Sequence, residues 1–167
     1  MKTKKLALMG ILTSLALIIF VVEAQLPPIG FAGVKLGLAN IITLFAICMI
    51  GKREAGAILL IRIILGSIYC GTMTAFIFSL VGGTLAYITM IIAYSLLGKD
   101  KLWVVSVFGA IAHNIGQLCA AVVVMQTPSL VVYLPVLIIS AIITGVFIGI
   151  LSQAVVNSPV NKHINKK

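Results

Sequence analysis

The residues that could do chemistry in this chain are a few polar side chains placed inside long apolar runs. Arg62 is the eighth residue of the apolar run 55–71, and His113 lies near the middle of the run 102–125. An arginine in the middle of a membrane segment costs at least about 2.5–3.5 kcal/mol on insertion scales, so its side chain should face a protein interior or a wet cavity. A guanidinium in such a place would supply positive charge to an anionic ligand.

Two amides accompany His113 on the run 102–125. Gln117 follows His113 by one helical turn and is expected on the same helix face. Asn114 is offset from His113 by about 100° around the helix, so it either joins the same site or faces a neighbouring helix. Polar side chains at these depths either join helices to one another or bind a ligand.

The remaining polar residues off the basic loops lie at the ends of the first two apolar runs. Glu23 closes the first run, and Lys35 and Asn40 begin the second. In a structural interpretation Glu23 pairs with Lys35, Arg62 bonds to carbonyl groups, and the other polar groups join helices. In a functional interpretation they form a pocket, open to the outer side, in which Glu23 and Lys35 close the rim. The predicted substrate-binding residues are Arg62, His113, Gln117, Asn40, Lys35, Glu23 and Asn114.

The sequence argues against catalysis by this chain alone. Glu54 and Asp100 stand singly beside basic residues, and no aspartate-rich motif could hold Mg²⁺ and a diphosphate. The chain has no P-loop, HExxH or GxSxG pattern. Three cysteines lie in apolar runs without metal-ligand spacing and are interpreted as packing residues: Cys48, Cys70 and Cys119. We therefore expect no catalytic residues, no cofactor and no bound metal.

The elements that must position these residues follow from composition. Of the 167 residues, 62% are hydrophobic and 9% are charged, whereas a soluble domain carries about 25% charged residues. A membrane-spanning helix needs about 20 mainly apolar residues. The sequence therefore predicts an all-α integral membrane protein, a single domain over 1–167, with six transmembrane helices at about 6–22, 36–50, 55–71, 73–97, 102–125 and 130–152.

The basic residues predict the orientation of this bundle. The formal net charge is +9, and ten of the twelve Lys and Arg residues fall at the termini or in the connections that follow the second and fourth spans. The positive-inside rule then places both termini in the cytoplasm and the protein in the cytoplasmic membrane as a multi-pass protein. These residues are expected to contact anionic lipid, not nucleic acid, because they are spread over separate loops without interleaved aromatic residues.

Several other features carry expectations about helix ends and helix packing. The first run is expected to be an uncleaved helix, because 23–28 is a poor signal-peptide cleavage site. Pro135 is expected in the first turn of the sixth helix, and the loop 27–37 could fold over a pocket as a lid. Small residues predict close helix contacts at Gly82, Gly83, Gly145 and Gly149, and on the first helix at Gly10 and Ser14.

Specific segments of the chain resemble one bacterial membrane family, the Gx transporter family, which is also catalogued as heptaprenyl diphosphate synthase component I. The resemblance covers nearly the whole chain, and it is most specific in GVKLGLAN and GAIAHNIGQ. The segments that carry it are GVKLGLANII at 33–42, Arg62 with Gly66, FSLVGG at 78–83, GAIAHNIGQ at 109–117 and YLP at 133–135.

This family is similar in size and layout to the six-helix S-components of energy-coupling factor transporters. That resemblance implies a ligand bound from the outer side beneath the first long loop. It also implies a transmembrane coupling subunit with ATPases as partner, contacted by small residues of the first helix. The resulting expectation is a substrate-binding transport protein that captures a small, anionic metabolite such as a vitamin, flavin or isoprenoid precursor.

Two other functions remain open from the sequence. The catalogued name implies an accessory subunit of polyprenyl diphosphate synthesis, which would be non-catalytic because the chain has a single aspartate. A structural subunit of a membrane redox complex would pair its buried polar groups only with one another. A cavity that reaches from the outer face to Arg62 and His113 would distinguish a binding protein from the structural subunit.

Overall fold

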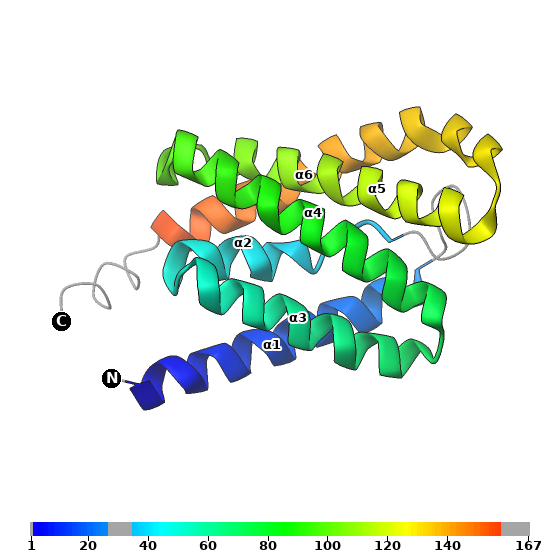
Figure 1. The fold of residues 1–167 in the computed structure, drawn as a ribbon. Helices are drawn as coiled ribbons and strands as arrows, with labels where there is room; N and C mark the ends of the chain where they lie inside the picture. Colours follow the sequence, from blue (N-terminus) through cyan, green and yellow to red (C-terminus); the bar gives the residue numbers. More distant parts are fainter. Residues whose placement is uncertain (1, 27–34, 158–167) are drawn as a thin grey trace.

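The computed structural model describes residues 2–26 and 35–157, and the chain in these ranges folds into α-helices joined by short connections (Figure 1). No β-strand occurs among the described residues, as the sequence predicted. Short 3-10 helices, η1 (Lys99–Lys101) and η2 (Pro128–Tyr133), precede the last two α-helices. The α-helices are α1 (Lys2–Gln25), α2 (Asn40–Met49), α3 (Lys52–Cys70), α4 (Met73–Leu97), α5 (Leu102–Met125) and α6 (Leu134–Asn157).

Four helical segments are long and apolar enough to cross a membrane: Thr3–Gln25, Met73–Leu97, Lys99–Met125 and Pro128–Asn157. The helix α3 has 19 residues, which is about 28 Å and close to the thickness of a hydrocarbon core. It carries three charged residues in its first turn and Arg62 in its middle. These helices identify an integral membrane protein, and the six-span topology stays a prediction.

The helix α2 is shorter than the sequence predicted. It begins at Asn40 instead of residue 36 and has ten residues, or about 15 Å, half the thickness of a hydrocarbon core. Gly37 has φ +76°, a left-handed conformation that ends regular helix geometry, and residues 35–37 are not helical. Non-helical backbone at membrane depth is tolerated where protein surrounds it.

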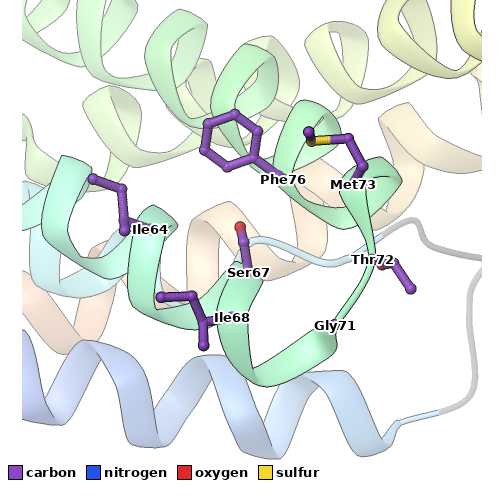
Figure 2. A pocket seen from close by; sticks show the side chains of 7 residues that line it. All are labelled: Ile64, Ser67, Ile68, Gly71, Thr72, Met73 and Phe76. Atoms are coloured by element: carbon purple, nitrogen blue, oxygen red, sulfur yellow. The ribbon is translucent and has the colours of Figure 1, made fainter.

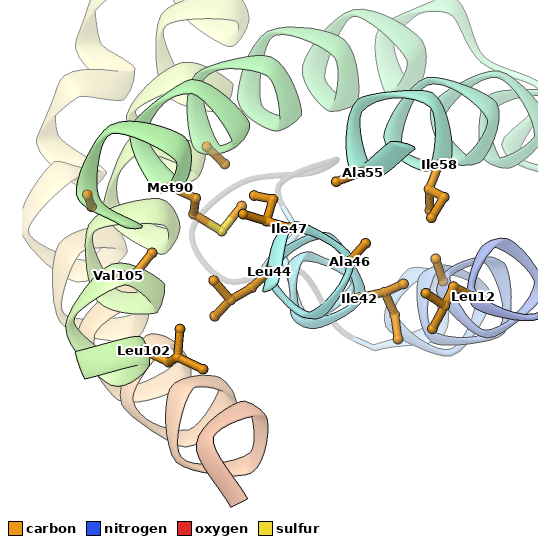
Figure 3. Close-up of a cluster of buried hydrophobic side chains, with 13 residues drawn as sticks. Leu12, Ile42, Leu44, Ala46, Ile47, Ala55, Ile58, Met90, Leu102 and Val105 are labelled. Carbon is orange, nitrogen blue, oxygen red and sulfur yellow. The ribbon is translucent and has the colours of Figure 1, made fainter. Parts of the chain in front are cut away.

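The short helix α2 lies at the centre of the bundle. It contacts each of the other five α-helices, and six of its ten residues are buried. Figure 3 shows the main apolar cluster around it, where Leu44 and Ile47 of α2 lie among Met90 of α4 and Val105 of α5. The same cluster continues to Leu12 of α1 on the other side of α2. Because α2 is surrounded in this way, the segment that precedes it is held inside the bundle.

Basic residues gather at one end of the bundle, which we call the basic end. Lys5 of α1 forms an ion pair with Glu54 of α3, and Gln153 of α6 donates from Nε2 to the Lys99 carbonyl at 3.0 Å. The beginning of α1 and the end of α6 both lie at this end, at the left of Figure 1. This arrangement is compatible with both termini on one side of the membrane, whose identity as the cytoplasmic side stays a prediction.

Glycines allow α4, α5 and α6 to approach one another closely. A Cβ added at Gly116 of α5 would lie 2.9 Å from the Cα of Gly82 in α4, and one at Gly149 of α6 would lie 2.3 Å from the Cα of Trp103 in α5. The predicted small-residue contacts at Gly82 and Gly149 are therefore confirmed. Gly10 of α1 differs, since outside its own helix no atom of the described residues lies within 4 Å of the position of its Cβ.

The start of α6 agrees with the expectation for Pro135. The helix begins at Leu134, so the proline stands in its first turn, where a missing N–H removes no helical hydrogen bond. The predicted sixth span began at residue 130, but residues 128–133 form η2 instead of α-helix. The predicted lid over 27–37 falls mostly outside the described residues, which resume at Lys35.

Candidate functional site

A small polar cavity in the bundle brings together side chains from four helices and from the segment before α2. Its volume is about 10 Å³, which is about the space needed to hold one water molecule. Five of the seven residues predicted for the site line it, joined by Phe20, Gly37 and Ser79. The lining residues are Phe20, Glu23, Lys35, Gly37, Arg62, Ser79, His113 and Gln117.

Arg62 projects from the middle of α3 into this cavity. Its side chain is 4% exposed, and within 2–26 and 35–157 it makes neither an ion pair nor a hydrogen bond. Its Nε atom is buried and has no partner among the residues that the structure describes. Its guanidinium lies next to Gly83 of α4, where an added Cβ would be in van der Waals contact with Nη2 at 3.6 Å. The structure thus confirms that Arg62 faces the protein interior, and the carbonyl contacts of the structural interpretation are not formed there.

Glu23, in the last turn of α1, holds the non-helical segment in place. Its Oε1 accepts hydrogen bonds from the backbone N–H groups of Gly37 and, at 3.3 Å, of Leu38. These N–H groups precede α2 and have no helical carbonyl to bond, so the carboxylate replaces one. Glu23 is 5% exposed, which makes its two backbone donors essential to its burial.

The predicted pairing of Glu23 with Lys35 is wrong in the described structure. The Lys35 ammonium instead lies over the ring of Phe20, with Nζ 3.3 Å from the ring centroid, and 3.6 Å from the Sγ of Cys70. Phe20 precedes Glu23 by three residues on the same face of α1, so the aromatic ring meets the ammonium while the carboxylate meets the backbone. A cation over an aromatic face is attracted by the ring quadrupole.

Gln117 and His113 join α5 to the same segment. The Oε1 of Gln117 accepts a hydrogen bond from the Lys35 backbone N–H at 3.0 Å, and its Nε2 lies 2.8 Å from the Nε2 of His113. Since the amide oxygen is used by Lys35, the amide nitrogen donates and the Nε2 of His113 accepts, which assigns the imidazole proton to Nδ1. The two residues share a helix face, as their spacing predicted.

The two asparagines of the predicted site differ in their surroundings. Asn40 is 5% exposed, and neither atom of its amide has a partner among the described residues. It lies beside the cavity, because a Cβ at Gly37 would be 2.9 Å from the Nδ2 of Asn40 and 2.8 Å from the Cδ2 of His113. Asn114 instead donates from Nδ2 to the Leu137 carbonyl of α6 at 2.8 Å. Asn114 therefore joins α5 to α6 outside the cavity, which is the second of its two predicted positions.

Sequence reasoning missed three residues that line the cavity. Ser79 is a small polar residue of a long apolar run, a pattern that is common in membrane helices and carries little information. Phe20 could have been found from its position one turn before Glu23 on α1. Gly37 could have been found only with the knowledge that the chain is non-helical there, which no local pattern supplies.

A larger groove lies where α3 meets α4, on the face of α3 that is turned away from Arg62 (Figure 2). Its volume is about 380 Å³, and the side chains of Ile64, Ile68 and Phe76 line it. Ser67 also lines it, but its hydroxyl donates to the Ile63 carbonyl at 2.6 Å. The residues that line the groove carry no charged side chain, and the groove suits a hydrocarbon chain. In the described part of the chain, no group of His, Cys, Asp and Glu residues could hold a metal ion.

These features define an integral membrane helical bundle with a small, cation-rich polar site in its interior. Comparison with family models identifies the family to which the chain belongs. The model for heptaprenyl diphosphate synthase component I matches residues 12–155, and the chain belongs to this family, as its sequence motifs predicted. No curated protein and no solved structure matched the chain significantly.

Proposed function

We propose that this protein is a non-catalytic membrane protein that captures a small anionic metabolite at the polar cavity around Arg62. The observation that carries the proposal is the state of Arg62. It is buried and lines the cavity, yet it has no ion pair and no hydrogen bond in the described part of the chain. Among the described residues that line the cavity, the charged groups are the cations Arg62 and Lys35 and the anion Glu23, while His113 is the neutral acceptor of the Gln117 amide. An anionic ligand would neutralise the excess positive charge.

A purely structural role explains some of the polar residues but leaves others unexplained. Glu23 and Gln117 accept hydrogen bonds from backbone N–H groups of the non-helical segment that precedes α2. The Nε of Arg62 and both amide atoms of Asn40 have no hydrogen-bond partner among the described residues. Burying a charge or an amide without partners costs free energy, and a ligand that bonds to both groups would offset that cost. Among the interpretations drawn from sequence, this favours a binding site over a structural subunit.

The size of the cavity defines what must move when a ligand binds. About 10 Å³ holds no metabolite, so the segment 35–39 must shift away from α1 and α5. Three hydrogen bonds hold this segment, from the N–H groups of Lys35, Gly37 and Leu38 to the side chains of Gln117 and Glu23. A hydrogen bond to a charged group contributes about 1.5–3 kcal/mol and one between neutral groups about 0.5–1.5 kcal/mol, so a ligand that displaces this segment must replace the bonds to Glu23 with charge-assisted bonds of its own.

Transport by this chain would need a separate energising partner, because the sequence has no nucleotide-binding motif. The layout expected from S-components supports a coupling subunit with ATPases as that partner. Capture from the outer side also rests on the predicted orientation, in which the basic end faces the cytoplasm. The cavity residue Glu23 comes from the end of α1 that is opposite the basic end.

Identification of retained small molecules tests the proposal. The protein is extracted gently and denatured, and the released anions are identified by untargeted mass spectrometry for the wild type, Arg62→Met and Arg53→Met. Arg53 is an exposed arginine on the same helix and serves as the matched control. We expect one anion to be enriched with the wild type and Arg53→Met and lost with Arg62→Met. Equal retention by all three proteins would contradict the proposal.

A second candidate function is favoured by the family match over residues 12–155. The family's name describes one component of a heptaprenyl diphosphate synthase, which supports an accessory role in which the chain presents a prenyl product or precursor at the membrane. In that case the protein should copurify with a soluble aspartate-rich synthase, and its deletion should shorten the polyprenyl products. Unchanged product lengths in the deletion strain would exclude this role.

A further inference from the structure

The carboxylate of Glu23 occupies a place built for an anion. Two successive backbone N–H groups, those of Gly37 and Leu38, point at one of its oxygens, and successive N–H groups of this kind form anion-binding concavities. Arg62 and Lys35 line the same cavity and add positive charge. The chain thus closes an anion-binding subsite with one of its own side chains.

We propose that Glu23 is a built-in competitor for the anionic group of the ligand. When the ligand binds, its carboxylate or phosphate takes the Gly37 and Leu38 N–H donors and the guanidinium of Arg62, and Glu23 is released. This inference rests on the proposed function, and it deepens it by assigning the subsite and the step that opens it.

The small cavity gives the physical reason for such an exchange. A space of about 10 Å³ cannot admit a carboxylate or phosphate beside Glu23, and two anions next to each other would repel. Arg62 has an unpartnered Nε even with Glu23 in place, so the side chain of Glu23 does not exhaust the donors of the subsite. An anion that reaches both the backbone N–H groups and the guanidinium would make more charge-assisted hydrogen bonds than Glu23 makes.

A purely structural Glu23 would behave differently from a competitor. If the carboxylate only serves as a hydrogen-bond acceptor for the backbone of the segment 35–39, a neutral glutamine amide oxygen would accept the same two hydrogen bonds. Truncation to alanine opens a place that a free carboxylate can fill in either case. A carboxylate that serves only the backbone would be replaced equally well without Arg62, whereas an anion subsite shared with Arg62 would lose that response. Acetate carries the same carboxylate group as the glutamate side chain, which makes it the appropriate probe.

The experiment measures the thermal unfolding of the full chain in detergent micelles during titration with sodium acetate, against sodium chloride at equal ionic strength. The variants are Glu23→Ala, Glu23→Gln and the double variant Glu23→Ala with Arg62→Met. We expect Glu23→Ala to unfold at a lower temperature than the wild type and to recover saturably in acetate. The wild type, Glu23→Gln and the double variant should not respond. An equal response of Glu23→Ala to acetate and chloride, or an undiminished response of the double variant, would overturn the proposal.

Poor folding of Glu23→Ala does not remove the test. In that case Glu23→Ala and the double variant are purified in parallel in acetate and in chloride, and the yield of monodisperse protein is compared. Recovery of Glu23→Ala in acetate alone, without recovery of the double variant, supports the anion subsite. Failure of Glu23→Ala, its equal recovery in both salts, or recovery of both variants in acetate overturns it.

The subsite and the proposed function can fail separately. If acetate does not rescue Glu23→Ala while the wild type still retains an anion that Arg62→Met loses, the subsite is wrong and the binding function stands. If acetate rescues Glu23→Ala but not the double variant, and the wild type retains no anion at all, the subsite is present and the proposed function is wrong.

Discussion

Replacing Arg62 by methionine should make the protein more stable while it removes ligand binding. Arg62 is 4% exposed and has no hydrogen bond or ion pair in the described residues, so its loss breaks no contact of that kind. Methionine keeps an unbranched apolar stem for packing against α4. The opposite result is expected for an arginine that joins helices, because removing one partner of a buried pair typically costs about 3–5 kcal/mol.

The magnitude follows from the burial of the charge. An arginine near the middle of a membrane helix costs at least about 2.5–3.5 kcal/mol on insertion scales, and part of this is offset by the attraction to Glu23 in the same cavity. We expect Arg62→Met to gain about 1–3 kcal/mol. At about 2–4 °C for each kcal/mol in a chain of this size, the unfolding temperature should rise by several degrees.

The assay is thermal unfolding in detergent, followed by reaction of the free cysteines with a thiol-sensitive dye. Cys48 and Cys70 are half-buried in the folded protein and become reactive when it unfolds. Arg53→Met, on the exposed surface of α3, is the control and should change the unfolding temperature by less than a degree or two. A lower unfolding temperature for Arg62→Met than for both the wild type and this control would refute the reasoning.

Three further predictions concern packing, the amides and the topology. Gly149→Ala should destabilise the protein by about 1–3 kcal/mol in a thermal unfolding assay, because a Cβ there meets the α5 backbone at 2.3 Å. Gly10→Ala should be tolerated, because outside its own helix no described residue lies within 4 Å of the added Cβ. Equal losses of stability in the two variants would contradict the close contact of α5 with α6. Asn114→Ala should lose about 1 kcal/mol through its bond to α6 and keep the retained anion. Asn40→Ala should keep the stability and lose the anion, and the reverse pattern in the two assays would refute the assignment. Lys101→Cys in a cysteine-free background should react with an impermeant maleimide only after the membrane is opened, and labelling of intact cells would contradict the predicted orientation.

Much of the helical layout could be predicted from the sequence because it depends on local hydropathy. The predicted fourth and fifth spans, 73–97 and 102–125, coincide with α4 and α5, since breaks that contain glycine, proline or charged residues bound both runs, at 71–72, 98–101 and 126–129. The second span was predicted too long. Residues 36–39 are as apolar as the helix that follows, and only the structure shows, in the left-handed φ of Gly37 and its contact with Glu23, that the chain is not yet regular helix there.

The residues of the site could be predicted, whereas their partners could not. Arg62 and His113 stand out because ionisable groups are rare in apolar runs, and both lie at the cavity. Which group bonds to Glu23 depends on the approach of α1 to a segment that is distant in sequence. Opposite charge suggested Lys35, but the unpaired backbone N–H groups of the segment before α2 bind the carboxylate instead. The hydrogen bonds that the folded backbone requires therefore determine the partner of Glu23, instead of the ion pair that the sequence suggested.

The central claim is that the buried charge of Arg62 recognises an anion, and equilibrium binding of the anion retained by the wild type tests it most directly. Its affinity is measured for the wild type, Arg62→Met and Arg53→Met in the same detergent. Loss of a hydrogen bond to a charged group costs about 1.5–3 kcal/mol, so we expect Arg62→Met to bind about 10–150 times more weakly and Arg53→Met to bind as the wild type does. An unchanged affinity of Arg62→Met would contradict the claim.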